Sequence, residues 1–276
     1  MQILLNTVML EVNRWTADHQ LTIPLIDLLP ALKEAGFDAL EIWQYHVSPM
    51  DRPEFDGLLA RLTELGMETH ILGVYPLLHQ TGPEGKEAAS QAARMVEYAA
   101  RLRADIVKIF AGRVASADAD EACWERSLTR LRDIAERAAD HGMLLTVETH
   151  GTTLADTVES AARLLHEMSD VGNLAICYQP YNFQDTDAAL SEFDAVAQHV
   201  KHVHLQNHDE KGNCRLTEGF LDYRRLLPHI KRSGFDGPLS LEFTTGIFPA
   251  EGETFQAQVV IDNAAKDRDF VIEVWG

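Results

Sequence analysis

A recurring junction organises the hydrophobic pattern of this chain. A stretch with helical spacing of apolar residues ends in glycine, one apolar residue follows, and a short apolar run then begins. The glycines at these junctions are Gly36, Gly66, Gly142 and Gly234. Glycine just beyond a helix readily adopts the left-handed conformation, so the chain can turn directly into a strand. The pattern therefore predicts helices that lead into strands.

The spacing of these glycines predicts a repeated βα unit. The intervals between them are 30, 76 and 92 residues, close to multiples of roughly 30 to 38 residues, which is a suitable length for one strand and one helix. Helical patterns are clearest at 118–141 and after Pro53. The expected strands are 2–9, 38–43, 67–73, 104–110, 143–148, 173–178, 200–206 and 238–243.

Eight such units are typical of an α/β fold, the (β/α)8 TIM barrel. We expect a single TIM-barrel domain over residues 1–276. A doubly wound open sheet is the alternative, but its usual nucleotide role needs a glycine-rich phosphate turn. Neither GxGxxG nor GxxxxGK occurs in the chain. The barrel is therefore favoured.

The charge and the cysteines narrow the class of protein. The 276 residues include 24 Lys and Arg against 43 Asp and Glu, which gives a formal net charge of −19. This acidity disfavours nucleic acid as a partner, and no segment approaches the ~18 apolar residues of a membrane span. Cys123, Cys177 and Cys214 show no CxxC spacing, so a reducing cytoplasm is expected. The sequence does not decide whether the chain forms a homo-oligomer.

The later predicted strands end in polar residues. Catalytic groups of TIM barrels lie at the carboxyl ends of strands. The fifth to eighth strands present Glu148, Gln179, His204 and Glu242 there. Two carboxylates and an imidazole from different strands predict a site for a divalent ion such as Mn²⁺, Mg²⁺ or Co²⁺. A neutral histidine ligand also needs an acceptor for its second ring nitrogen, which the sequence does not identify.

Other residues near the predicted strand ends are candidates for substrate binding. Lys108 has two interpretations, a substrate contact or a cation that pairs with a carboxylate such as Glu148. Trp43 either lines an apolar wall for the carbon face of a sugar or simply packs. Glu41 also lies near the predicted barrel mouth. The full set of substrate-binding candidates is His150, Asn182, Arg215, His70, Lys108 and Trp43.

Much of the chain resembles the xylose isomerase-like TIM barrels, the group of sugar phosphate isomerases and epimerases that includes AP endonuclease family 2. The segments VETHGTT, QPYN, KHVHLQNHD, TEGFLDYRRLL and SGFDGPLSLEF follow one another as in D-tagatose 3-epimerase and inosose dehydratase type enzymes. The resemblance implies one divalent ion (Mn, Mg, Co or Zn) held by Glu, Asp, His and Glu, with both Glu residues exchanging protons with the substrate.

Three of the four implied ligands match this chain, namely Glu148, His204 and Glu242. Gln179 stands where the family has Asp, which removes one negative charge from the ligand set and lowers its expected affinity for a hard cation. The family's histidine three positions after that Asp is replaced here by Asn182. The usual substrate contacts are therefore not transferred as a set.

The predicted function is that of a metal-dependent isomerase or epimerase of carbohydrate metabolism, acting on a small sugar or polyhydroxylated ketone. A metal that polarises the carbonyl would acidify the neighbouring C–H and stabilise an enediolate, with Glu148 and Glu242 as general acid and base. Loss of a β-hydroxyl would make the enzyme a dehydratase instead. A non-catalytic sugar-binding barrel is a further alternative, supported by Gln179. An abasic-site phosphodiesterase is disfavoured because ligands for its metal cluster are missing.

Overall fold

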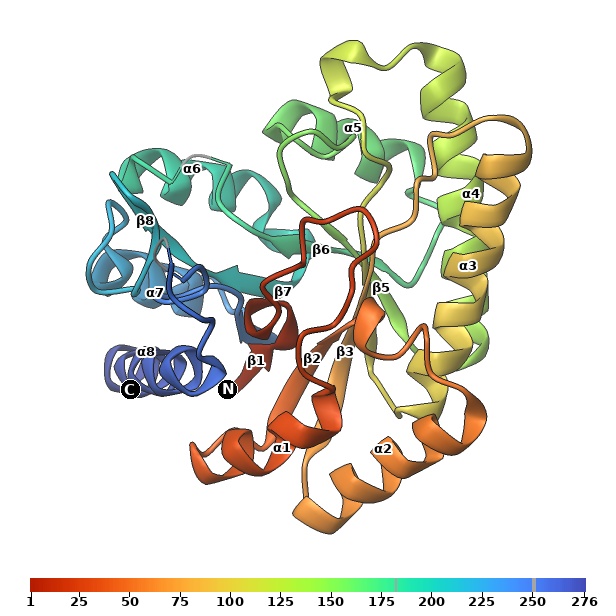
Figure 1. Ribbon diagram of the computed structural model, residues 1–276. Coiled ribbons are helices and arrows are strands. Elements are labelled where there is room, and N and C mark those ends of the chain that lie inside the picture. The colour runs from red at the N-terminus through yellow and green to blue at the C-terminus, as the bar shows by residue number, and fades with distance from the viewer. Residues whose placement is uncertain (182, 250–251) are drawn as a thin grey trace. The chain divides into compact units, whose positions relative to one another are not determined.

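A computed structural model of the chain (Figure 1) describes residues 1–276 except 182 and 250–251. Its parallel strands follow the order β1-β10-β7-β6-β5-β4-β3-β2, which is that of a closed barrel. These strands are β1 (Gln2–Asn6), β2 (Ala39–Trp43), β3 (Glu68–Val74), β4 (Ile106–Ile109), β5 (Leu144–Glu148), β6 (Leu174–Tyr178), β7 (Val200–Leu205) and β10 (Pro238–Leu241). Every predicted strand has its counterpart, and the (β/α)8 class is confirmed.

Helices follow the strands in alternation, as the glycine junctions predict (Figure 1). They are α1 (Leu25–Glu34), α2 (Arg52–Leu65), α3 (Gly82–Arg101), α4 (Glu121–Asp140), α5 (Val158–Glu167), α6 (Thr186–Val196), α7 (Tyr223–Arg232) and α8 (Ala257–Trp275). No helix in the described part of the chain is both long and apolar enough to cross a membrane.

The chain divides into two compact units, which are described separately. Unit 1 comprises residues 1–69, 182–190 and 204–276. In it, β1 pairs in parallel with β10 on one side and β2 on the other, with Leu5 opposite Leu241 and Leu40. These three leucines are fully buried or nearly so. The helices of unit 1 pack in the pairs α1 with α2 and α7 with α8.

Unit 2 comprises residues 70–181 and 191–203. It contains the parallel ladder from β3 through β4 and β5 to β6 and the start of β7. Helices α3 and α4 pack beside each other (Figure 1). The ladder places Lys108 of β4 opposite Thr146 of β5, and Glu148 opposite Cys177 of β6. Polar residues of neighbouring strands are thereby brought to adjacent positions near their carboxyl ends.

Local sequence explains where α2 begins and ends. Asp51 accepts a hydrogen bond from the Glu54 amide while the Glu54 side chain accepts one from the Asp51 amide, both at 2.9 Å. This capping box and the proline in the first turn favour helix initiation. At the other end Gly66 is left-handed, with φ of 60°. Gly36, Gly142 and Gly234 are also left-handed, with φ of 84°, 73° and 87°, so the junction signal is confirmed.

Three strands, β1, β4 and β10, are shorter than expected by two residues or more, and one ribbon was not expected. The first strand ends at Asn6, because the Asn6 side chain accepts a hydrogen bond from the Val8 amide at 3.1 Å and caps a 3-10 turn over Thr7–Leu10. Strand β10 ends at Leu241, so Glu242 lies one residue beyond it. The loop after β7 contains an antiparallel ribbon of β8 (Asn207–Asp209) and β9 (Gly212–Cys214).

The same substitution at two glycines should change stability in opposite directions. Gly57 is exposed within α2, and Gly142 is left-handed; an added Cβ would meet nothing within 4 Å at either position. Gly57→Ala should raise the free energy of unfolding by about 0.5–1 kcal/mol, because alanine is the better helix former. Gly142→Ala should lower it by about 1–2 kcal/mol, because a Cβ is strained at positive φ. Urea denaturation of both variants checks this; equal shifts would contradict the assigned conformations.

Candidate active site

A buried histidine is the centre of a polar cluster in unit 1. His204 of β7 lies between two carboxylates, with its Nε2 atom 3.1 Å from Glu41 Oε2 and its Nδ1 atom 3.2 Å from Glu242 Oε2. The side chains of His204 and Glu41 are fully buried. In the neutral imidazole a proton on Nε2 is donated to Glu41, and the lone pair on Nδ1 then faces the Glu242 carboxylate. Two electron-pair donors pointing at the same space form the kind of arrangement that holds a cation.

Glu41 supplies the partner for the second ring nitrogen that the sequence did not identify. It lies in β2, far from His204 in sequence. The only sequence signal was its position near the end of a predicted strand. A carboxylate that holds the distal ring nitrogen of a metal-binding histidine fixes both its tautomer and its ring orientation.

Gln206 also orients the Glu242 carboxylate, through the same oxygen atom that faces His204. The Gln206 amide group donates to Glu242 Oε2 at 2.9 Å. Its carbonyl oxygen accepts from Asn213 at 3.1 Å, which ties it to the ribbon of β8 and β9. Tyr223 donates its hydroxyl to the Gln206 backbone carbonyl at 2.6 Å. The unexpected ribbon thus contributes to positioning a predicted catalytic carboxylate.

A second polar cluster lies in unit 2 around Lys108 and Glu148. The Lys108 Nζ atom is 2.5 Å from Glu148 Oε2, and both side chains are almost completely buried. Lys108 also donates to the Tyr75 hydroxyl at 2.7 Å and lies 5.2 Å from the centre of the Phe110 ring. Of the two interpretations of Lys108, the structure shows the pairing with Glu148. A buried cation therefore compensates the carboxylate at the end of β5.

Gln179 and His150 lie in the loops next to this pair. Gln179 follows β6 and is buried. Its backbone amide donates to the Thr149 hydroxyl at 2.8 Å, and that hydroxyl donates to the Gln179 carbonyl at 2.7 Å. His150 Nδ1 lies 2.6 Å from the Gly151 carbonyl, and its ring centre is 4.8 Å from that of Phe110. The residue after Glu148 thus fixes the backbone at Gln179.

His70 does not lie where the sequence suggested. It is near the amino end of β3, and its Nδ1 atom is 2.6 Å from Asp105, the residue that precedes β4. The barrel mouth is at the carboxyl ends of the strands, so the expectation that His70 lies near the mouth is corrected. Its side chain tethers the starts of two strands.

Arg215 and Trp43 make structural contacts in unit 1. The Arg215 Nε atom is 3.3 Å from Asp267 of α8, and burial raises the pKa of that aspartate to about 6. Trp43 ends β2, is buried, and packs against Tyr45 with ring centres 4.7 Å apart. Asn182, the remaining substrate-binding candidate, lies outside the described residues.

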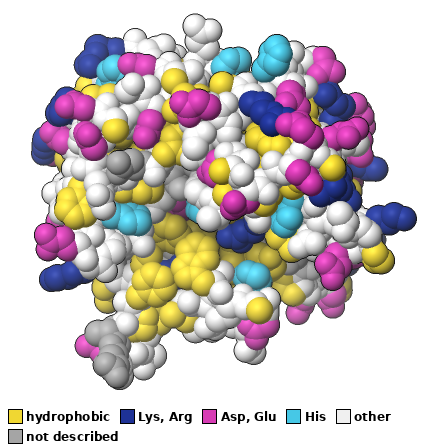
Figure 2. Space-filling view, turned by 90° about the horizontal axis from the view of Figure 1, so that it is seen from above, with side chains coloured by type: hydrophobic (Ala, Val, Ile, Leu, Met, Phe, Trp, Pro, Cys, Tyr) yellow, Lys and Arg dark blue, Asp and Glu magenta, His cyan; other side chains and the backbone are white. Residues whose placement is uncertain are grey.

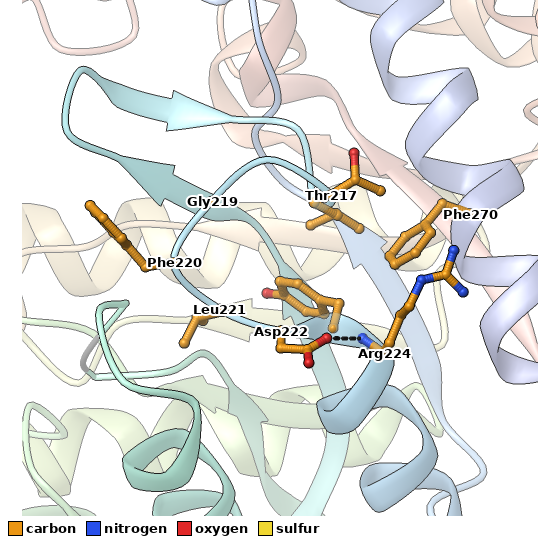
Figure 3. A pocket seen from close by; sticks show the side chains of 9 residues that line it. Thr217, Gly219, Phe220, Leu221, Asp222, Arg224 and Phe270 are labelled. Carbon is orange, nitrogen blue, oxygen red and sulfur yellow. Dashed lines mark hydrogen bonds between the residues drawn. The ribbon is translucent and has the colours of Figure 1, made fainter.

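A pocket of about 220 Å³ in unit 1 lies between the loop that precedes α7, the start of α7, and α8 (Figure 3). Asp222 accepts a hydrogen bond from the Arg224 amide at 2.9 Å and caps α7. The Arg224 guanidinium lies over the Phe270 ring at 5.1 Å and pairs with Glu273 at 2.9 Å. These polar groups hold helix ends together, and the strand-end candidates are not among the residues that line the pocket.

Arg14 joins the loops that follow β1 and β10. Its buried guanidinium donates to the carbonyls of Glu11 and Ile247 and lies 4.3 Å from the centre of the Phe248 ring. Burial lowers the pKa of Arg14 to about 10. Trp15 and Phe248, which flank it, are 60% and 52% exposed. On the face shown in Figure 2, hydrophobic side chains gather in the lower central part of the view, and the surface above them carries a mixture of polar and charged side chains.

Known proteins similar to this chain are enzymes that act on small molecules. The 3-dehydroshikimate dehydratase of Bacillus anthracis is 26% identical over 193 residues, which are 68% of this chain and 68% of that protein. The fructoselysine 3-epimerase of Shigella flexneri is 22% identical over 254 residues, covering 86% of this chain and 91% of the epimerase.

Similarity extends to solved structures of the same fold. A xylose isomerase-like TIM barrel protein from Mycobacterium smegmatis, solved in complex with magnesium, matches with a TM-score of 0.74 and 15% identity, covering 99% of this chain and 96% of that one. The family description "Xylose isomerase-like TIM barrel" matches residues 29–263. The chain belongs to the xylose isomerase-like TIM barrel family.

Proposed function

We propose that this protein is a divalent-metal-dependent isomerase or epimerase of a small sugar or polyhydroxylated ketone. The observation that carries the proposal is the position of His204 between Glu41 and Glu242. A buried imidazole whose distal nitrogen is held by a carboxylate is typical of a metal ligand. Family membership supports the same reading, since the similar proteins include an epimerase.

The ligands that we propose for the ion are Glu148, Gln179, His204 and Glu242. Carboxylate and amide oxygens with one imidazole suit Mn²⁺, Mg²⁺, Co²⁺ or Zn²⁺, so the donor types fit the group. The magnesium complex of the Mycobacterium smegmatis protein supports a divalent ion in this fold. When bound, the ion would polarise the substrate carbonyl and stabilise the negative charge that develops on its oxygen.

Glu148 and Glu242 are the proposed general acid and base. One removes the proton next to the carbonyl, and the other returns a proton to the resulting enediolate. Gln206 holds Glu242 by a hydrogen bond at 2.9 Å, which restricts the carboxylate to one orientation. Lys108 does the same for Glu148 at 2.5 Å. We assign His150 to substrate hydrogen bonding, because it opens the polar loop directly after Glu148.

Dehydration is the second candidate reaction. It begins with the same abstraction of a proton next to a carbonyl, but a β-hydroxyl then leaves instead of a proton returning. The 26% identity to a 3-dehydroshikimate dehydratase favours this candidate. Product analysis separates the two reactions, because only dehydration changes the mass of the substrate.

We expect purified protein to bind about one divalent ion per chain. Glu148→Ala combined with His204→Ala should abolish binding. Glu41→Gln should weaken it by about 10–100-fold, because the ring loses the carboxylate that orients it. Gln179→Asp should strengthen it, because the ligand set gains a negative charge. Elemental analysis and calorimetric titration measure these effects, with the exposed Glu34→Gln on α1 as the matched control. An unchanged ion content in the double variant would rule out these ligands.

Turnover of the substrate found by screening ketoses with added Mn²⁺ should depend on both carboxylates. Glu148→Gln and Glu242→Gln each remove an acid–base group, so kcat should fall by about 10²–10⁴-fold. Exchange of the substrate's α-proton with solvent deuterium, followed by NMR, should fall in parallel. Circular dichroism confirms that the variants are folded. Full activity in both variants would contradict the assigned roles.

The buried pair in unit 2 predicts a non-additive effect on stability. Lys108→Met leaves the Glu148 charge uncompensated and should lower the free energy of unfolding by about 3–5 kcal/mol. Adding Glu148→Gln should recover much of that loss, because the double variant buries no net charge. Chemical denaturation at pH 7 measures both proteins. A double variant that is less stable than Lys108→Met would show that the pairing is not the dominant interaction.

A further inference from the structure

The buried face of α8 in unit 1 carries a carboxylate. Asp267 is 1% exposed, and the other buried positions of this helix, from Ala257 to Val271, are apolar. A carboxylate in such a stripe loses its water, which costs free energy even when the group is paired and hydrogen-bonded. Asparagine has nearly the same shape and carries no charge, so helix packing alone does not explain the carboxylate.

Three hydrogen-bond donors from two segments of unit 1 converge on the Asp267 carboxylate. The Thr244 hydroxyl, in the segment after β10, donates to Oδ2 at 2.6 Å. The Leu216 amide, in the segment after β9, donates to Oδ1 at 3.1 Å. The Arg215 Nε atom, in the same segment, lies 3.3 Å from Oδ1. One carboxylate thereby ties both segments to α8.

Both segments lead to Glu242. Thr244 lies two residues after it in the chain. In the other segment, the Leu216 carbonyl accepts a hydrogen bond from the Asn207 side chain at 3.0 Å. The residue before Asn207 is Gln206, whose side chain donates to Glu242 at 2.9 Å. The carboxylate on α8 therefore anchors the backbone that carries the proposed acid–base residue and also the segment that orients its side chain.

The surroundings of Asp267 favour its neutral form, yet it is ionised at neutral pH, because burial raises its pKa to about 6. Its titratable and charged neighbours are Arg215 and Cys214 on the β9 side and Tyr223 of α7. Burial raises the pKa of Cys214 to about 12 and also raises that of Tyr223, so Arg215 supplies the counter-charge. The turn over Thr7–Leu10 and strand β10 also pack against α8 and carry no ionisable side chain, and those of α1 are not buried.

We propose that Asp267 is a positioning residue for Glu242. Its charge holds the segments after β9 and β10 more rigidly than a neutral side chain would, because hydrogen bonds to an ionised acceptor are shorter and stronger than neutral ones. The effect on catalysis rests on the proposed function, since it requires Glu242 to act as acid or base. The effect on the hydrogen bond between Gln206 and Glu242 does not depend on that function.

The first experiment measures positioning without turnover. In protein labelled with ¹⁵N, the NMR signals of the Gln206 side-chain amide report its hydrogen bond to Glu242. Asp267→Asn should shift and broaden these signals, because both segments that hold the pair lose a charged anchor. Asp262→Asn removes an exposed carboxylate of the same helix and should leave them unchanged. Gln206 signals that are the same in Asp267→Asn and in the wild type would overturn the proposal.

The pH dependence of the Leu216 amide signal separates Asp267 from the other carboxylates. In the wild type it should titrate with a midpoint at about pH 6, because the amide donates to the carboxylate, and Asp267→Asn should abolish this transition. Thr244→Val removes a hydrogen bond that lowers the pKa of Asp267, so it should raise the midpoint. It should also shift the Gln206 signals, which keeps the test valid if Asp267→Asn does not fold. A Leu216 signal that does not titrate in the wild type would contradict the contact.

Thermal stability separates positioning from a purely structural tie. The raised pKa means that folding favours the protonated carboxyl, so the stability contributed by Asp267 is present below about pH 4 and is lost as the pH rises through about 6. Asp267→Asn keeps the hydrogen-bonding shape without the charge. Its Tm at about pH 7.5 should therefore equal or exceed that of the wild type, and any gain should disappear near pH 4. A lower Tm at pH 7.5 would indicate a structural tie and overturn the assignment.

The last experiment tests the link to catalysis. Exchange of the C–H protons of dihydroxyacetone with deuterium from D₂O is followed by NMR at saturating Mg²⁺. We expect kcat for exchange to fall about tenfold in Asp267→Asn, KM to change less than twofold, and Asp262→Asn to match the wild type. Equal kcat in Asp267→Asn and the wild type would overturn the proposal and leave the proposed function intact. The expected Gln206 shift, without exchange of dihydroxyacetone or any screened ketose by the wild type, would uphold the positioning contact and reject the proposed function.

Discussion

The burial of ionisable groups at the strand ends is the constraint on which the rest of the structure depends. His204 is removed from water between Glu41 and Glu242, and removing such charges from water costs several kcal/mol per ion unless they are paired and hydrogen-bonded. Each partner must therefore be held in place. Strands β2 and β7 hold Glu41 and His204, while the backbone amide of Glu242 is fixed by the Leu205 carbonyl at 3.0 Å. Packing keeps these strands in register and so keeps the partners in contact, which lowers the free-energy cost of burying the cluster.

Unit 2 meets the same constraint with a lysine. Glu148 is buried beside Lys108, and the ammonium group is further surrounded by the Tyr75 hydroxyl and the rings of Tyr75 and Phe110. Aromatic faces stabilise a cation that has lost its water. Two features make the charge of this site differ from that of the ligand set that the resemblance implies. A lysine lies next to a proposed acid–base residue, and glutamine replaces the family's aspartate. Lys108 adds a positive charge beside Glu148, and Gln179 lacks the negative charge of the aspartate that the resemblance implies.

The loops after the strand ends are anchored by arginine side chains, while most acidic side chains of the chain are exposed. The Arg14 guanidinium donates to the carbonyls of Glu11 and Ile247 and so joins the loops after β1 and β10. Arg215 pairs with Asp267 and so joins the segment after β9 to α8. Most acidic side chains are exposed, so the net charge of −19 is mainly a property of the outer surface. It bears on solubility and on the sign of a partner's charge more than on the chemistry of the buried groups.

The sequence by itself determined the fold class, the order of the strands and the residues at their carboxyl ends. These features depend on local physics, namely glycine at the left-handed junctions and side-chain periodicity, so the positions of Glu148, Gln179, His204 and Glu242 near the carboxyl ends of their strands could be predicted without coordinates. Their roles as ligands stay a proposal. Three features required the tertiary structure: the pairing of Lys108 with Glu148, the role of Glu41, and the position of His70 at the amino end of β3. Each depends on strand register and on contacts between residues distant in sequence, which local patterns do not encode. The ribbon of β8 and β9, which fixes Gln206, was missed because its strands have three residues each, too short for any periodic signal.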